Sequence, residues 1–327
     1  MKFRKKLILF LIFEIIFTGL TFPLYTFYGP FKKVRNVVVT SAMATGNHRY
    51  IATWFFSEKE INSIIAEDGK NLNDNSNLNN SNKQKVEIKN EDNGIERMEV
   101  NTSKFEGVAL IVHNPKRVKV GYTSKLGQVG EPTSKMAKRY NALAAINGGG
   151  YEDVSPNGKT GGVGGTPIGI IIADGKIVYP LEKNNYKKRE NCVFAIDDKG
   201  YMHVGPASVE ELVNSNTKEA ISFSPTLVVD GNPYISENSL GGINPRTAIG
   251  QKADGSIILL AIDGRQGLKL GAAIKDVQNI MLQLGAVNAM CLDGGGSTTM
   301  YYGNEVINSP SCVTGERAVP SIVYVEP

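Results

Sequence analysis

The most informative segment of the sequence is AMCLDGGGSTT, residues Ala289 to Thr299. An apolar run ends at Asp293, and three glycines followed by hydroxyl-bearing residues come directly after it. Such a loop can present backbone N–H groups to an anion, while the hydroxyl groups of Ser297 and Thr298 add further donors. The segment contains neither the GxxxxGK[ST] phosphate loop nor the GxGxxG dinucleotide fingerprint, which argues against ATP or NAD binding. It predicts a strand that ends in a carboxylate and an anion-binding loop.

A second loop of this kind is AINGGGY, residues 145–151. Successive glycines, among them Gly149 and Gly150, let a ligand approach the backbone closely. Asn147 can donate and accept hydrogen bonds, and Tyr151 offers an aromatic face to a sugar ring. Taken alone, the segment is equally typical of a mobile surface loop.

Two charged segments complete the set. Arg246 opens a strand in NPRT, residues 244–247, and a guanidinium matches phosphate or carboxylate with paired hydrogen bonds. Asp263 follows the apolar run LLAI, where a general base, a metal ligand and a turn residue are all open alternatives. Alone, each is more typical of a surface salt bridge or a turn. Together, the four segments fit a single pocket for an anionic, hydroxyl-rich ligand.

Composition narrows the class of protein. The 36 basic and 32 acidic residues give a net charge of +4, mostly from a basic cluster within the first six positions. This balance does not favour a nucleic-acid partner. The three cysteines exclude a disulfide scaffold, and Cys291 is expected to be a packing residue. The three histidines are scattered and show no HExxH spacing that would predict a metal site.

The N-terminus predicts a membrane anchor. Leu7 to Tyr28 is nearly all apolar, and roughly 20 such residues span a bilayer. No small-x-small cleavage site follows, which favours an uncleaved anchor over a removed signal peptide, with a buried core helix as the alternative. The expected partner is therefore the lipid bilayer through residues 7–28. The basic tip favours a cytoplasmic N-terminus and an extracellular C-terminal domain.

Four regions are expected along the chain: a cytoplasmic tip and transmembrane anchor (1–30), a membrane-proximal stalk (31–70), an Asn-rich flexible linker (71–98) and a catalytic domain (99–327). Within the stalk, Val37 to Thr40 resembles a strand, and Ser57 with Glu60 forms a capping box that predicts a helix. The linker has too few aromatic and β-branched residues to offset its ordering entropy by burial.

The catalytic domain is predicted to be α+β: a β-rich mixed-sheet domain with a few packed helices, preceded by the N-terminal transmembrane helix. Short apolar runs alternate there with turn signals such as Asp-Gly and Asn-Pro. The expected hairpins pair Val108–Val112 with Val118–Tyr122, Ile168–Ile172 with Lys176–Tyr179, and Ala248–Gln251 with Ile257–Ile262, and the expected helices are Ser134–Asn141, Ser208–Asn214 and Ala272–Leu284.

The same segments carry a family resemblance. From about Phe105 to Val325 the chain resembles the phosphodiester glycosidase family. This family is related to the enzyme that uncovers mannose 6-phosphate and to bacterial proteins associated with exopolysaccharide biosynthesis. Six short motifs occur in the family's order. They are INGGGY (146–151), GTPIG (165–169), NPRTAIG (244–250), IDGR (262–265), LDGGGST (292–298) and GERAVP (315–320).

The resemblance implies a hydrolase that cleaves a sugar from a phosphodiester at its anomeric carbon. The implied substrate is a phosphorylated surface glycan or glycopolymer. No cofactor is required by this chemistry, although a divalent cation on Asp263 and Asp293 is an open alternative. The implied catalytic residues are Asp263, Asp293 and Arg246, and the implied substrate-binding residues are Asn147, Gly149, Gly150, Tyr151, Arg265, Gly294, Gly295, Gly296, Ser297, Thr298 and Arg317.

The chemistry needs positive charge on the phosphate and a carboxylate near the sugar. Arg246, Arg317 and the glycine-loop N–H groups would provide the first, and Asp263 or Asp293 the second. Two other functions use the same residues. One is a non-catalytic binder of phosphorylated polysaccharide, and the other is a scaffold in a surface-polymer export complex. Retention of both aspartates favours an enzyme, because a binder of anions gains little from carboxylates beside phosphate.

Overall fold

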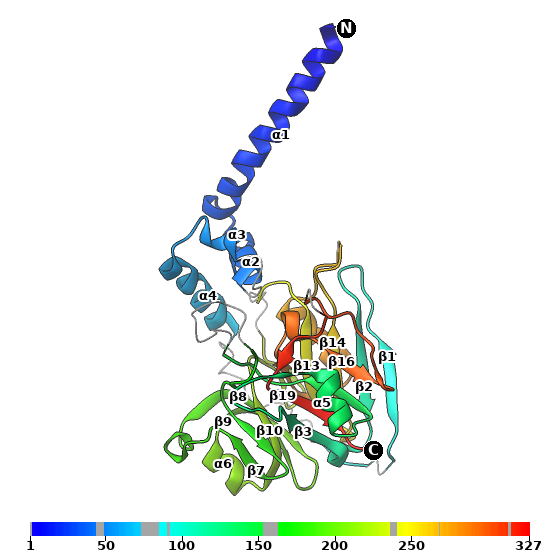
Figure 1. Cartoon of the computed structure of the whole chain (residues 1–327). Helices are drawn as coiled ribbons and strands as arrows, with labels where there is room; N and C mark the ends of the chain where they lie inside the picture. Colours follow the sequence, from blue (N-terminus) through cyan, green and yellow to red (C-terminus); the bar gives the residue numbers. More distant parts are fainter. Residues whose placement is uncertain are drawn as a thin grey trace. The chain divides into compact units, whose positions relative to one another are not determined.

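A computed structural model describes residues 2–43, 49–72, 85–89, 92–152, 163–235, 241–267, 269–312 and 315–327. The chain divides into two compact units, Met1–Asp68 and Gly69–Pro327. Helices make up the described part of the first unit, and β-sheets dominate the second (Figure 1). The predicted α+β, β-rich fold is confirmed.

The first unit begins with α1 (Lys2–Tyr28), which is long and apolar enough to cross a membrane. It continues through α2 (Lys32–Met43), α3 (Tyr50–Thr53) and α4 (Glu58–Leu72). The predicted capping box is confirmed, because Glu60 accepts a hydrogen bond from the Ser57 amide at 2.8 Å. These helices share a small apolar cluster that includes Phe27, Val39 and Ile61.

The strand predicted for Val37 to Thr40 is wrong, because these residues lie within α2. Val39 and Ala42, three positions apart, are both buried in the apolar cluster of the first unit. Residues three apart share a helix face, so burying this pair requires helical spacing. Tertiary packing here outweighs the strand preference of a run of valines.

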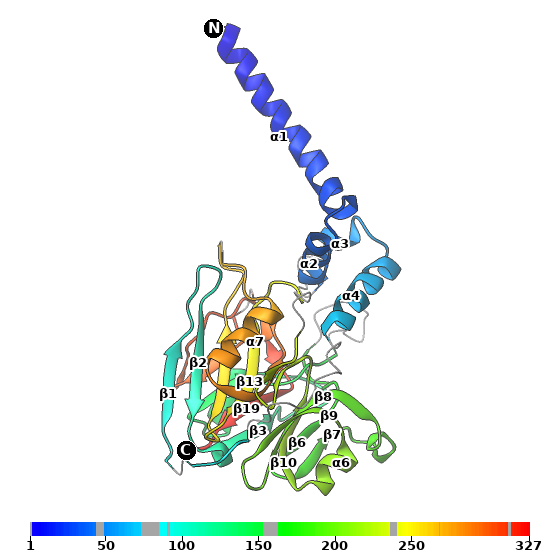
Figure 2. The same ribbon diagram turned by 180° about the vertical axis from the view of Figure 1, so that it is seen from behind.

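The second unit is organised around a seven-stranded sheet in the order β1-β2-β14-β13-β15-β11-β12, with antiparallel pairing throughout. Its strands β2 and β14 are buried along their whole length, as expected for strands covered on both faces of the sheet. Helix α7 (Ile274–Gln283) packs on one face (Figure 2). The strands are β1 (Ile95–Glu99), β2 (Gly107–Val112), β11 (Thr226–Val229), β12 (Asn232–Pro233), β13 (Arg246–Lys252), β14 (Ile257–Ile262) and β15 (Ala286–Leu292).

Two five-stranded sheets and a two-stranded pair complete the unit. One large apolar cluster joins all three larger sheets, with Leu110, Ile146 and Phe194 as members. The sheet β17-β16-β5-β19-β3 contains β3 (Val118–Tyr122), β5 (Ala144–Asn147), β16 (Met300–Tyr302), β17 (Glu305–Val306) and β19 (Ser321–Val325). The sheet β7-β6-β10-β8-β9 contains β6 (Ile171–Ala173), β7 (Lys176–Tyr179), β8 (Arg189–Asp197), β9 (Met202–Ser208) and β10 (Thr217–Ser222), and the pair is β4 (Glu131–Pro132) with β18 (Ala318–Val319).

Two of the three predicted hairpins are confirmed, β6 with β7 and β13 with β14. The first is wrong, because β2 pairs with β1 and β14, whereas β3 pairs with β19. Both edges of β2 are therefore occupied by other strands. A short 3₁₀ turn at Pro115–Arg117 leads the chain into a different sheet.

The three helices predicted for this unit are present with slightly shorter bounds. They are α5 (Thr133–Arg139), α6 (Val209–Asn214) and α7. Helix α6 begins with a true capping box, in which Ser208 and Glu211 exchange hydrogen bonds. Helix α7 begins with a different arrangement, because the amide of its N-cap residue Ala273 donates to Asp276 Oδ2 at 3.1 Å, while alanine has no side-chain oxygen to return a bond.

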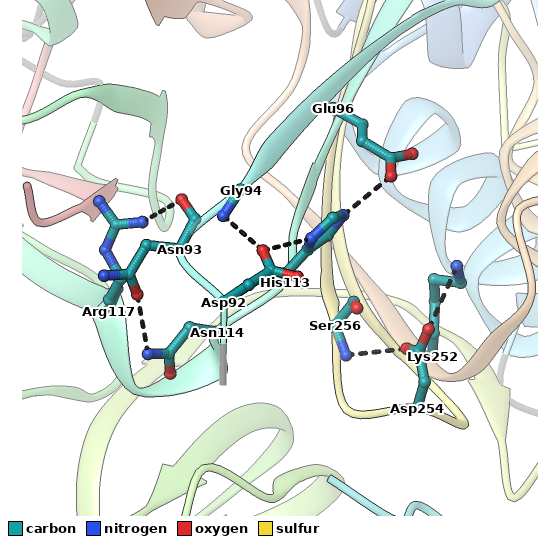
Figure 3. Close-up of polar contacts among 10 residues, drawn as sticks. All are labelled: Asp92, Asn93, Gly94, Glu96, His113, Asn114, Arg117, Lys252, Asp254 and Ser256. Carbon is teal, nitrogen blue, oxygen red and sulfur yellow. Dashed lines mark hydrogen bonds and ion pairs between the residues drawn. The ribbon is translucent and has the colours of Figure 1, made fainter. Parts of the chain in front are cut away.

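Part of the region predicted as a linker is ordered against the domain. Residues 73–84 and 90–91 lie outside the described residues, but β1 pairs with β2, so the domain begins before Glu99. We call residues 85–89 and 92–94 the N-terminal strap. The Glu87 amide donates to the Ala253 carbonyl at 2.8 Å, and Ile88 lies against Gly255. Figure 3 shows the second half of the strap held by polar side chains of the domain.

Candidate active site

Three strands from two sheets end at the same place. The Asp293 amide, just after β15, donates to the Gly148 carbonyl just after β5, at 3.0 Å. The Gly295 amide donates to the Pro245 carbonyl, just before β13, at 2.8 Å. The two triglycine loops and the NPRT segment predicted from sequence are therefore neighbours in space. Since Gly294 lies so near Pro245 that a Cβ would be 2.8 Å from its carbonyl oxygen, this approach needs glycine.

The side chain of Asn147 connects these loops by hydrogen bonds. Its side chain is fully buried, and Nδ2 donates to the Asp293 carbonyl at 2.6 Å. Its Oδ1 accepts from Thr247 Oγ1 at 2.8 Å and from the Thr299 amide at 3.1 Å. An amide with both ends engaged in this way fixes three loop segments at once. Asn147 thus links three segments of the candidate site from a buried position.

Arg246 lies at the start of β13 and is half-buried. Its Nε donates to the Ala272 carbonyl at 3.1 Å, and its Nη2 donates to the carbonyls of Gly242, at 2.8 Å, and Gly241. These bonds fix the plane and direction of the guanidinium. They also hold this strand-opening arginine at the site.

Arg265 and Arg317 bring two further positive charges to this place. Arg265 adopts a left-handed backbone conformation, with φ of 60°, and its Nη2 donates to Asn244 Oδ1 at 2.9 Å. Burial, followed by the positive charges of Arg246 and Arg317, lowers the pKa of Arg265 to about 10. The guanidinium still carries its charge at neutral pH. Three like charges this close repel one another, so the cluster favours a bound anion.

The loop of residues 145–151 contacts the loop of residues 289–299 through Tyr151. This side chain is buried, its hydroxyl lies 3.5 Å from Ser297 Oγ, and the Arg317 guanidinium carbon lies 5.2 Å from its ring centroid. A cation over an aromatic face is attracted by the ring's electron density. Ser297 and Thr298 are themselves almost fully buried. Tyr151 is therefore part of the packed wall that positions Arg317.

Asp263 is tied to a loop that sequence analysis did not single out. Its Oδ1 accepts from Asn308 Nδ2 at 2.9 Å, and both of its oxygens lie 3.0 Å from the Ser309 amide. Burial raises the pKa of the Asp263 carboxyl, and the hydrogen bonds from Asn308 and Ser309 oppose part of this rise. Asn308 and Ser309 follow β17 without any motif, so only their place in the fold identifies them.

Asp293 is half-buried, and its backbone is fixed from both sides by Gly148 and Asn147. Its neighbour Cys291 is fully buried, and burial raises the pKa of that thiol to about 12. A thiol in this environment stays protonated at neutral pH, in line with the expected packing role. Among the described residues, no group of three or more His, Cys, Asp or Glu side chains is arranged to share a metal ion.

The sequence was compared with known families and proteins. The family model for phosphodiester glycosidase matches residues 140–326. An uncharacterised SPbeta prophage-derived protein of Bacillus subtilis, YomE, is 31% identical over 188 residues, which cover 55% of this chain and 27% of that protein. The N-acetylglucosamine-1-phosphodiester alpha-N-acetylglucosaminidase of Mus musculus is 27% identical over 165 residues, which cover 45% of this chain and 31% of that enzyme.

Among solved structures, the catalytic domain of the zebrafish N-acetylglucosamine-1-phosphodiester alpha-N-acetylglucosaminidase, auto-inhibited by its pro-peptide, superimposes with a TM-score of 0.59 at 23% identity. The match covers 75% of this chain and 87% of that one, and it shows a shared fold. The chain spans about a third or less of the length of the two curated relatives. The matched region includes both triglycine loops, all three arginines and both aspartates of the site, and the chain belongs to the phosphodiester glycosidase family.

Proposed function

We propose that this chain is a membrane-anchored hydrolase that releases a sugar from a phosphodiester at its anomeric carbon, and that its substrate is an extracellular glycan or glycopolymer. The observation that carries the proposal is the cluster of Arg246, Arg265 and Arg317 beside two triglycine loops and two aspartates. Such a cluster suits a diester phosphate, which stays anionic, and the family relatives named for this reaction support the choice.

The arginines stabilise negative charge as it grows on the leaving phosphate. A phosphate monoester is a good leaving group, so strong protonation of the leaving oxygen is less necessary than in ordinary glycoside hydrolysis. Fixed donors contribute most where charge develops in the transition state. The carbonyls that hold Arg246 keep its guanidinium in one orientation and so lower the cost of organising it.

We assign the carboxylate on the sugar side to Asp293. Both oxygens of Asp263 accept hydrogen bonds from Asn308 and Ser309, which suits a residue that positions a loop. Asp293 comes directly before the glycine loop and has its backbone fixed at two points. A carboxylate held there can activate water or stabilise an oxocarbenium-like centre. The sugar then leaves with the hydroxyl of water, and the phosphate leaves as a monoester.

The membrane part of the proposal rests on α1 and its basic flanks. The helix meets the length and apolarity needed to span a bilayer, which supports an anchor. An external domain would meet phosphorylated cell-surface polymers. The phosphate groups of these polymers are anions, which the arginine cluster favours.

The decisive experiment is turnover by the purified full-length chain. The probes are methyl phosphodiesters of N-acetylglucosamine, glucose and mannose, each joined through the anomeric carbon, with release of reducing sugar as the readout. We expect Asp293→Asn to lower kcat by roughly a thousandfold, about 4 kcal/mol of transition-state stabilisation, with little change in thermal midpoint. Asp263→Asn should retain more activity and lower the midpoint instead.

Arg246 separates an enzyme from a binder. Arg246→Ala should lose more kcat/KM than Arg246→Lys, and neither should match the wild type, because lysine cannot make the paired contacts of a guanidinium. In oxygen-18 water, the label should enter the released sugar. Label in the phosphate would show attack at phosphorus and a phosphodiesterase mechanism. Tight phosphate binding with no turnover of any probe would show a non-catalytic binder.

A further inference from the structure

A second concave site lies beside the triglycine loop of residues 148–150. It is a pocket of about 250 Å³ between β8 and the end of β10, two neighbouring strands of one sheet. Its lining combines the apolar side chains of Ile168 and Phe223 with the polar side chains of Glu190 and Asn191. At ~30 Å³ per water molecule, the volume equals about eight waters, the scale of one small polar ring and too little for an oligosaccharide.

The backbone is shaped to form this pocket. The pairing of β8 with β9 shifts register between Glu190 and Val193, so Asn191 and Cys192 lie in a β-bulge. Bulges re-aim side chains and are common next to active sites. Cys192 is tied down by a contact of 2.6 Å with Thr226 Oγ1, and burial raises the pKa of its thiol, so it acts as a wall and not as a nucleophile.

The triglycine loop of residues 148–150 links the lining of the pocket to the wall of the arginine cluster. The Phe223 ring lies directly against Gly150, where a Cβ would be only 3.1 Å from it. The next residue is Tyr151, whose hydroxyl lies 3.5 Å from Ser297 and whose ring faces Arg317. One peptide unit, about 3.8 Å between Cα atoms, therefore connects the pocket lining to the wall of the anion site.

Charge decides what the pocket takes. The Glu190 side chain is 25% exposed, and its carboxylate lies 3.3 Å from the exposed Lys188 ammonium. The negative charge of this carboxylate disfavours a phosphate in the pocket. Neutral hydroxyl groups donate well to a carboxylate, and an aromatic ring suits the C–H face of a sugar. We infer that this pocket, lined by Phe223, Glu190 and Asn191, binds one neutral sugar ring of the substrate while the arginines bind the adjoining phosphate. This inference rests on the proposed function.

The test measures sugar and phosphate binding separately, using the full chain in a polyoxyethylene ether detergent that has neither sugar nor phosphate groups. Saturation-transfer NMR with N-acetylglucosamine, glucose and mannose should give a signal with at least one of the three. Glu190→Gln and Phe223→Leu should each weaken that sugar about tenfold, the usual effect of losing a hydrogen bond to a charged group or part of an apolar contact. Glu210→Gln, an exposed glutamate on α6, is the matched control and should change nothing.

Inorganic phosphate, followed by phosphorus NMR, is the second probe. Glu190→Gln should leave phosphate binding unchanged, whereas Arg246→Ala should weaken phosphate and leave the sugar in place. If turnover is also found, Glu190→Gln should raise KM more than it lowers kcat, as loss of uniform binding requires. Absence of turnover with sugar binding intact would overturn the proposed function alone. Absence of sugar binding, or sugar binding unaffected by Glu190→Gln and Phe223→Leu, would overturn the pocket alone.

Discussion

The structural role of Asn147 follows from hydrogen-bond partners that lie far away in the sequence. Its sequence setting, before three glycines, predicted a ligand contact. The structure buries it and gives it partners at Asp293, Thr247 and Thr299, all about a hundred or more positions away. No local pattern encodes partners at that distance. The sequence did identify the loops, the arginines and the aspartates, because glycine runs and charges after apolar strands are local signals.

This buried role makes Asn147→Ala a test of structure at the site. The change leaves the Thr299 amide and the Asp293 carbonyl without this partner, each at a cost of about 1–3 kcal/mol, whereas the Thr247 hydroxyl keeps Thr298 Oγ1 at 3.3 Å. Together these costs are about 2–6 kcal/mol, so at about 2–4 °C per kcal/mol we expect the thermal midpoint to fall by roughly 4–24 °C, and turnover to fall with it.

The control for Asn147 is Asn185→Ala, which truncates an exposed asparagine of the second unit. It should leave both the midpoint and turnover unchanged. A normal midpoint in Asn147→Ala with lost turnover would instead assign Asn147 to direct substrate contact, as the family resemblance implied.

At the scale of elements, sequence patterns succeeded where the signal was local and failed where pairing was distant. The hairpins β6–β7 and β13–β14 each close over a short turn and were predicted. Strand β2 lies next to β3 in sequence but pairs with β14, some 150 residues later, because a central strand must fill both edges. The sequence did not predict the α2 helix, because its run of valines favours a strand. The helix forms because it buries Val39 and Ala42 on one face.

The N-terminal strap makes the stability of the second unit depend on pH. Figure 3 shows His113 between two carboxylates: its Nδ1 lies 2.7 Å from Asp92 and its Nε2 lies 2.9 Å from Glu96. The hydrogen bond to Asp92, with a further contribution from Glu96, raises the pKa of His113 above 6.5 although burial opposes it. Arg117 also holds the strap, because it donates to the Asn93 carbonyl at 2.6 Å.

The sign of the effect follows from the direction of the shift. Because the folded-state pKa of His113 is raised, its stabilisation is complete below pH 6.5 and is lost as pH rises through the folded value. The pKa of Asp92 is lowered from 3.8, chiefly by the Gly94 amide, so its contribution is present above that pH and is lost in stronger acid. The strap is therefore held best in mildly acidic solution.

We expect His113→Gln to lower the thermal midpoint more at pH 6 than at pH 9, by about 2 °C, the scale of a partly exposed ion pair. The hydrogen-exchange protection of the Gly94 and His113 region, measured relative to the intrinsic base-catalysed rate at each pH, should fall over the same pH range in the wild type. His203→Gln, at an exposed histidine on β9, is the matched control. An equal loss for His113→Gln at both pH values would remove its charge from the explanation.

At the scale of the whole molecule, the chain joins a helical unit bearing one long apolar helix to a β-rich unit bearing the site. Composition alone predicted both parts, because a run of apolar residues and an alternation of short strands are visible without tertiary information. What composition does not determine is the side of the membrane on which the site operates. Four basic side chains precede the apolar run and three follow it, a balance that favours a cytoplasmic N-terminus.

Trypsin added to intact cells that express the chain tests this orientation. The Asn-rich stretch at the start of the second unit contains Lys83 and Lys85 and has almost no aromatic or β-branched residues, a composition that predicts accessible backbone. With the β-rich unit outside, trypsin should release a soluble fragment that begins at Gln84 or Val86 and retains the site. Replacing Lys83 and Lys85 with glutamine should slow its release without affecting turnover. A fragment that appears only after lysis would place the site in the cytoplasm, and the substrate would then have to be an intracellular sugar phosphodiester and not a surface polymer.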